Sequence, residues 1–150
     1  MTILTASELQ SILNDAFPGL DVPQVEEVND DSILICQSIA DRHGRPGGTI
    51  SGPTMMILAD TSAWLAILAQ VGPVLLAVTT SLHIDFLRKP QLRDLMSRAR
   101  VLKLGRKLAV VEIDLFSRGA DELVAKAQVT YALPSSTQQA NEDPTDRPTH

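Results

Sequence analysis

The chain has 150 residues, of which 44% are hydrophobic and 21% charged, a composition typical of one globular domain that can bury a core. The formal net charge of -5 argues against general nucleic-acid binding, which requires a basic surface. The single cysteine, Cys36, excludes an internal disulfide framework and a cysteine-rich metal site, and we expect neither a metal nor another cofactor.

The N-terminal half begins with a predicted short helix over residues 5–17. Thr5 and Glu8 have the spacing of a capping box, and apolar residues recur after them at helical intervals. No basic region followed by an apolar stretch precedes this helix, so we expect a cytoplasmic protein rather than a secreted one. Two strands, over residues 22–28 and 32–40, should then form a hairpin, because the Asn and Asp residues between them favour a turn. Residues 41–48 are predicted to be an irregular loop.

Residues 53–70 predict the main helix of the protein. Pro53 suits a first helical turn, and Gly72-Pro73 should end the helix. The segment is apolar on nearly all sides, which is typical of a helix buried in a core. A membrane span is the alternative, but three consecutive polar residues, 60–62, and a length at the short end of what a bilayer requires argue against it.

The C-terminal half is predicted to be strand, because apolar residues alternate along it and short polar links interrupt it. Sequential strands with short links favour an antiparallel meander. From residue 134 onward no apolar anchor remains, so we expect 134–150 to be a disordered tail. The predicted strands cover residues 74–86, 92–104, 107–117 and 123–133.

Together these elements predict a single α+β domain over residues 1–133. An antiparallel sheet of about six strands would wrap around one long central helix, which would bury that helix on all sides. The edge strands of such a sheet require cover, and a second copy of the chain can supply it. We therefore expect a homodimer or a dimer of dimers, and no membrane partner.

Asp60 is the main candidate for chemistry, because it is a carboxylate in the middle of an apolar helix. Removing a carboxylate from water costs several kcal/mol unless other groups compensate. Asp60 is therefore either a base or nucleophile at the end of an apolar pocket, or a structural residue bonded to Thr or Ser hydroxyls of a neighbouring element. Before the helix, the glycine-rich residues 47–52 allow a ligand to approach the backbone, and the N–H groups at the helix start can polarise a carbonyl oxygen.

The chain resembles the hotdog-fold acyl-CoA thioesterases of the phenylacetyl-CoA thioesterase type over roughly residues 30–133. The resemblance is carried by GGTISGPTMMILADT from Gly47 and AVTTSLHIDFLRKP from Ala77. RARVLKLGRKLAVVEIDLF from Arg98 and LVAKAQVTY from Leu123 also match. The resemblance implies the hotdog fold and hydrolysis of an acyl thioester to CoA and a carboxylic acid.

The resemblance also implies roles for individual residues. Asp60 matches the helix carboxylate that activates water or attacks the thioester carbon, and Gly52 matches the glycine whose N–H polarises the thioester carbonyl. The assisting hydroxyl matches Thr79, with Thr80 as the alternative if the alignment shifts by one. The chain departs from the family at Ser51, where a His is usual, and at Arg45, where Asn or His is frequent.

Other residues are weaker candidates for substrate contacts. Cationic residues in turns can hold the phosphates of CoA, although each can equally be a solvated turn charge. His43 and His83 have no obvious acidic partner in the sequence, which disfavours an enoyl-CoA hydratase. A non-catalytic acyl-CoA binding protein remains the main alternative to a thioesterase. The candidate substrate-binding residues are Arg45, Ser51, Met56, Trp64, Thr80, Arg88, Lys89, Arg106 and Lys107.

Overall fold

The computed structural model describes residues 2–135, so the predicted tail, 134–150, lies outside the described residues except for Pro134 and Ser135. Within that range the chain forms two α-helices, one six-stranded sheet and one small two-stranded ribbon. The elements in chain order are α1 (Ala6–Ala16), β1 (Gln24–Val28), β2 (Ile33–Gln37), η1 (Asp41–His43), β3 (Gly44–Arg45), β4 (Thr49–Ile50), α2 (Gly52–Val71), β5 (Val78–Phe86), β6 (Leu95–Leu104), β7 (Leu108–Ser117) and β8 (Leu123–Ala132).

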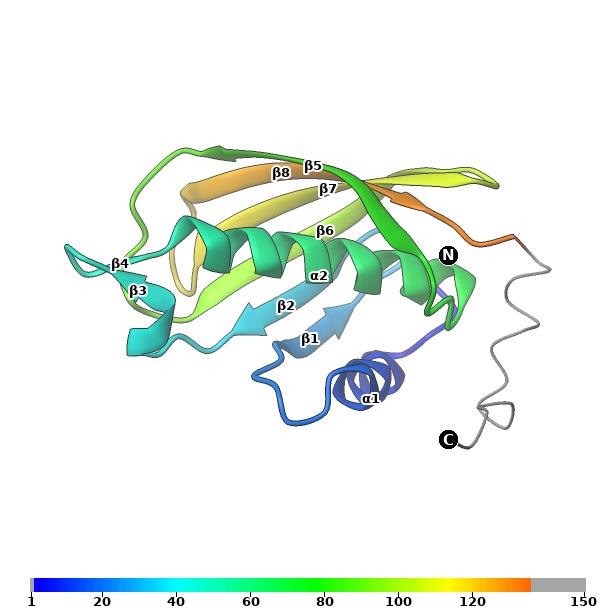
Figure 1. The fold of residues 1–150 in the computed structure, drawn as a ribbon, viewed down its shortest axis with the longest axis horizontal. Helices are drawn as coiled ribbons and strands as arrows, with labels where there is room; N and C mark the ends of the chain where they lie inside the picture. The colour runs from blue at the N-terminus through cyan, green and yellow to red at the C-terminus, as the bar shows by residue number, and fades with distance from the viewer. Residues whose placement is uncertain (1, 136–150) are drawn as a thin grey trace, which may run out of the picture.

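The main sheet has the order β1-β2-β6-β7-β8-β5, and every neighbouring pair is antiparallel. The long helix α2 lies across one face of this sheet and packs mainly on β6, β7 and β8 (Figure 1). Along β7, every second residue is buried, as expected for a strand with one face against the helix. The predicted α+β architecture, with about six strands around one central helix and a short N-terminal helix, is therefore confirmed.

The helix α2 begins and ends at the residues that the sequence marks for this purpose. Ser51 caps it by accepting a hydrogen bond from the Thr54 N–H at 3.3 Å, and Pro53 stands in the first turn. At the other end Gly72 adopts a φ of 92°, a conformation that favours glycine, and its N–H donates to the Leu68 carbonyl. The prediction over residues 53–70 is thus correct to within one residue at each end.

The interior position of α2 agrees with its composition. By length and composition the helix could cross a membrane, but 61% of the apolar window is buried inside the protein. One polar contact fixes α2 on the sheet, because the Ser97 hydroxyl of β6 donates to the Ser62 hydroxyl at 2.8 Å. Both serines are 0% exposed. The apolar helix is therefore the core of this domain, as expected.

The helix α1 covers one edge of the sheet. Thr5 and Glu8 form the predicted capping box, each side chain bonding the other residue's N–H at 3.2 Å. Leu9 and Leu13 are fully buried, and the helix lies beside β1 (Figure 1). At the opposite edge, no element of residues 2–135 pairs with the outer side of β5. Neither edge strand has a further strand partner among residues 2–135, but the two edges differ because α1 packs beside β1.

Two local predictions are wrong. Residues 74–77 form a turn, in which the Ala77 N–H donates to the Val74 carbonyl at 3.2 Å, so β5 begins at Val78. Residues 41–48 contain the short helix η1 and the strand β3, which pairs with β4. Gly47 and Gly48, with φ angles of 100° and 72°, make the tight turn of this ribbon.

The predicted meander of the last four strands is correct only for β6, β7 and β8. The strand β5 pairs with β8 at the sheet edge, and β6 pairs with β2, so the chain between β5 and β6 crosses the sheet. That connection runs from residue 87 to 94, which is longer than the usual hairpin loop of about two to five residues. It also contains Pro90, which has no N–H for a strand ladder.

Candidate active site

The Asp60 side chain is held on one oxygen by two hydroxyl groups. The Thr79 Oγ1 donates to Asp60 Oδ1 at 2.7 Å, and the Tyr131 hydroxyl donates to the same oxygen at 2.9 Å. The Tyr131 hydroxyl also reaches the Asp60 backbone carbonyl at 3.1 Å. The second carboxylate oxygen, Oδ2, receives no hydrogen bond from the described part of the chain. One oxygen therefore fixes the carboxylate, and the other is available for chemistry.

The register of the sheet explains how these two donors meet. Thr79 on β5 and Tyr131 on β8 are directly opposite each other in the strand pair, beside α2. The shifts in register between Thr79 and Ser81 accompany a local irregularity of β5 at this point. Thr80 instead donates to the Thr130 carbonyl at 3.2 Å. The structure thus brings Thr79, and not its alternative Thr80, to Asp60.

Tyr131 is a site residue that sequence reasoning missed. It lies 71 positions from Asp60 in the chain, so no local motif connects the two residues. Burial raises the pKa of the Tyr131 hydroxyl, and the neighbouring Asp60 carboxylate raises it further. The phenol therefore remains a protonated donor. The sequence did offer an indication that Tyr131 is a site residue, because Tyr131 is the only tyrosine of the chain and lies on the inward face of an aliphatic strand.

A cavity of about 330 Å³ opens beside Asp60, and we call it the Asp60 cavity. Trp64, on the next turn of α2, forms one wall and packs edge-to-face on Phe17, with ring centroids 6.1 Å apart. Most of the wall is apolar, so that the carboxylate faces a mainly hydrocarbon surface. The residues that line it are Ala16, Phe17, Asp60, Thr61, Trp64, Leu75, Ala77 and Tyr131.

Gly52 belongs to a second cavity at the start of α2. This Gly52 pocket has a volume of about 250 Å³ and includes three cationic side chains, Arg45, Arg88 and Lys89. Arg88 pairs with Glu122 at 3.2 Å, whereas Arg45 and Lys89 form no ion pair with any described residue. The remaining lining residues are Thr49, Ile50, Met55, Phe86 and Pro90.

Gly52 and Asp60 do not meet within one protomer. They lie eight residues apart on one continuous helix, which corresponds to about 12 Å along its axis. A single thioester carbonyl cannot touch both groups at that separation, since each contact requires about 3 Å. The two groups of one chain therefore belong to two separate cavities.

The other predicted residues are scattered around these cavities. Met56 is 40% exposed on the turn of α2 before Asp60, and Ser51 is the helix cap. Arg106 and Lys107 lie at the turn between β6 and β7, which is the opposite end of the sheet from the Gly52 pocket. One protomer therefore does not bring them together with Arg88 and Lys89.

Both candidate histidines have acidic partners, contrary to the expectation. His83 pairs with Asp85 at 3.0 Å on an exposed stretch of β5, and His43 pairs with Asp21 at 3.3 Å. Neither histidine lines the Asp60 cavity or the Gly52 pocket. Among residues 2–135, the structure therefore places no histidine beside the candidate carboxylate.

Comparison with known proteins identifies the family of the chain. The family model described as the thioesterase superfamily matches residues 47–124. A Pseudomonas aeruginosa protein whose name describes it as an esterase, PA0474, is 30% identical over 103 residues, which cover 68% of this chain and 75% of that protein.

Two solved structures are similar over most of the chain. A protein from Silicibacter sp. TM1040, described as a thioesterase, is 41% identical, with a TM-score of 0.82 over 89% of this chain and 94% of the other. Zebrafish thioesterase superfamily member 2 is 25% identical, with a TM-score of 0.77 over 88% of this chain and 100% of the other. The segment matched by the family model includes the helix α2 and the strands β5, β6 and β7.

Proposed function

Because the chain belongs to the thioesterase superfamily and is a thioester hydrolase of the hotdog fold, we propose that it hydrolyses acyl-CoA esters at Asp60. The observation that carries this proposal is the Asp60 carboxylate at the wall of an apolar cavity, with one oxygen clamped and the other free. Family membership favours hydrolysis over the binding-only and hydratase alternatives. The phenylacetyl-CoA subtype remains a prediction.

The proposed reaction uses the free Oδ2 of Asp60. As a general base, this oxygen takes a proton from water while the water oxygen attacks the thioester carbon. The C–S bond then breaks, the acid is released, and the proton passes to the CoA thiolate. As a nucleophile, Oδ2 instead attacks the thioester carbon, the C–S bond breaks, and the CoA thiolate leaves behind a mixed anhydride; water then hydrolyses the anhydride to the free acid and the Asp60 carboxylate, and the released proton passes to the thiolate. In both routes an N–H donor must stabilise the oxyanion, and we assign this to Gly52 at the positive end of α2.

The Gly52 pocket supports the choice of CoA as the thiol. Arg45, Arg88 and Lys89 surround the proposed oxyanion donor, and guanidinium and ammonium groups bind phosphates through charge-assisted hydrogen bonds. The pantetheine arm of CoA separates its phosphates from its thiol, so we propose that these long cationic side chains contact the phosphates where the arm leaves the pocket, away from the reacting carbonyl. Arg45 thereby has a role although it replaces the residue that the family usually has.

A second copy of the chain would complete the site. Gly52 and Asp60 are about 12 Å apart in one protomer, so a single carbonyl requires Gly52 from one copy and Asp60 from another. The open edge of β5 and the exposed apolar side chains Ile57 (68% exposed) and Val78 (58%) offer a surface for this contact. We therefore propose a homodimer, with pairing into a tetramer as the alternative.

Thiol release from acyl-CoA esters tests the role of Asp60. Asp60→Asn removes the basic and nucleophilic oxygen but keeps the size of the side chain and its ability to form hydrogen bonds. We therefore expect kcat to fall by about 100-fold or more. Asp121→Asn, an identical change in an exposed turn, serves as the control. Turnover by Asp60→Asn at the rate of the control would remove Asp60 from the mechanism.

Complementation tests whether the site is shared between copies. Gly52→Pro removes the N–H while the extended Ser51 before it still permits a helix start, so it should be inactive like Asp60→Asn. Mixing and refolding the two inactive variants should restore about a quarter of the wild-type activity, because half of the dimers are mixed and each has one intact site. No recovery from a mixture shown to contain mixed dimers would contradict the shared site.

A further inference from the structure

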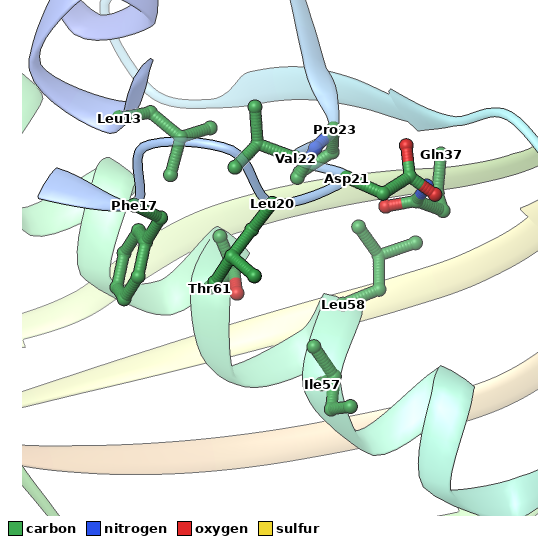
Figure 2. Close-up of a pocket in the computed structure, with 10 residues that line it drawn as sticks. All are labelled: Leu13, Phe17, Leu20, Asp21, Val22, Pro23, Gln37, Ile57, Leu58 and Thr61. Carbon is green, nitrogen blue, oxygen red and sulfur yellow. The ribbon is translucent and has the colours of Figure 1, made fainter. Parts of the chain in front are cut away.

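A groove lies next to the Asp60 cavity, between α2 and the segment that joins α1 to β1 (Figure 2). Its volume is about 190 Å³, and two of its lining residues, Phe17 and Thr61, also line the Asp60 cavity. We call it the Gln37 groove. Its lining residues are Leu13, Phe17, Leu20, Asp21, Val22, Pro23, Gln37, Ile57, Leu58 and Thr61.

The groove has an apolar body and one polar end. Figure 2 shows Phe17 at one end, and the Asp21 carboxyl and the Gln37 amide side by side at the other. Leu20, Ile57 and Leu58 lie between these ends. A ligand that enters from the Asp60 cavity therefore meets hydrocarbon first and polar atoms last.

The hydrogen bonds of Gln37 fix which of its atoms is free. Its Nε2 donates to Asp21 Oδ2 at 3.3 Å and to the Ser38 carbonyl at 3.1 Å. Since both partners are acceptors, the nitrogen must face them, and the amide cannot be turned the other way. Its Oε1 accepts no hydrogen bond from any residue in 2–135.

That free oxygen is buried. The Gln37 residue is only 8% exposed, and leaving a buried polar atom without a partner is unfavourable. Asp21 is already engaged, because its Oδ2 contacts Arg42, His43 at 3.3 Å and Gln37. His43 can only donate here, since its Nδ1 accepts from the Ala40 N–H at 2.9 Å. The polar end therefore offers an acceptor to a ligand, held in place by its neighbours.

We propose that the Gln37 groove binds the acyl group of the substrate and that Gln37 Oε1 selects acyl groups with a hydrogen-bond donor, such as a hydroxyl, at the far end. The inference rests on the proposed hydrolysis at Asp60, because the shared Phe17 and Thr61 connect the groove to that carboxylate. A buried cavity of about 150 Å³ holds a benzene molecule, so this groove suits an acyl group of roughly six to eight heavy atoms. Gln37 is then a specificity-determining residue of the site.

Matched pairs of acyl-CoA esters test this selection in the wild-type protein. Butanoyl-, hexanoyl- and octanoyl-CoA are each compared with the ester that carries a terminal hydroxyl, by thiol release. At the chain length that reaches Gln37, the hydroxylated ester should have about a 10-fold higher kcat/KM, because only it satisfies the buried oxygen. At the other lengths the hydroxyl should lower kcat/KM, since it enters an apolar surface.

Gln37→Met tests the assigned atom, since methionine has a similar shape without the amide. The ratio of kcat/KM between the two esters of the selected pair should fall to about one in this variant. Gln128→Met, the same change on the exposed face of β8, should keep the wild-type ratio. The inference is overturned if the hydroxyl gives no gain at any length, or if the gain persists in Gln37→Met. Release of thiol from none of the esters would overturn the proposed function itself.

Discussion

Removing the hydroxyl of Tyr131 is the most direct test of how the Asp60 carboxylate is held. Tyr131→Phe keeps the ring, which fills a site only 4% exposed, and removes a single donor from Asp60 Oδ1. A hydrogen bond to a charged group contributes about 1.5–3 kcal/mol, and each 1.36 kcal/mol corresponds to a tenfold change in rate. Because Thr79 still holds the same oxygen at 2.7 Å, we expect the lower end of this range, a fall in kcat of about 10-fold.

The assay is steady-state thiol release, with kcat and KM measured separately. Loss of positioning should reduce kcat more than it raises KM, since Tyr131 lines neither the groove proposed for the acyl group nor the pocket proposed for CoA. Thr79→Val should act in the same direction, and the double variant should lose more than the product of the two single losses, because Oδ1 then has no donor. Thr130→Val, which removes a hydroxyl from the neighbouring position of β8, is the control. Wild-type kcat in Tyr131→Phe, or a change confined to KM, would refute the reasoning.

Two further predictions concern stability, and both are measured as urea midpoints. Ser62→Ala or Ser97→Ala alone should lower the free energy of unfolding by about 1–3 kcal/mol, because each leaves a buried hydroxyl without its partner. The double variant should be closer to wild type in its free energy of unfolding, and strictly additive losses would contradict this prediction. The hydrogen bond from Lys126 lowers the pKa of Glu112, so its contribution should be present at about pH 7 and disappear as the pH falls through the lowered pKa. Glu112→Gln should therefore cost less than about 1 kcal/mol at pH 7 and progressively less as the pH falls through the lowered pKa, and a cost that does not change with pH would count against the Lys126 pair.

The elements of this fold that depend on local chemistry could be predicted from the sequence. The capping box at Thr5 and the stop at Gly72 are signals within a few residues of the helix ends that they mark. The position of β5 could not be predicted in the same way, because nothing in its own residues shows that β8 rather than β6 is its neighbour. Only the length of the connection before β6 gave an indication of the crossing.

The residues of the candidate site show the same difference between local signals and long-range strand pairing. Asp60 could be predicted because a carboxylate in an apolar helix is unusual by itself, and Thr79 followed from the resemblance. Tyr131 reaches Asp60 only through the pairing of β5 with β8, which the sequence did not show. The separation between Arg106 and Arg88 has the same origin, since it depends on which ends of the strands lie together.

The central helix has a consequence for the order of events on the ribosome. The chain completes α2 at Val71, but the strands that cover it, β6 to β8, are synthesised later, and the last of them ends at Ala132. During that interval the nascent polypeptide carries an apolar segment of 20 residues without the surface against which it packs. Such a segment associates readily with other chains, so productive folding of this enzyme depends on protecting α2 until its C-terminal strands emerge.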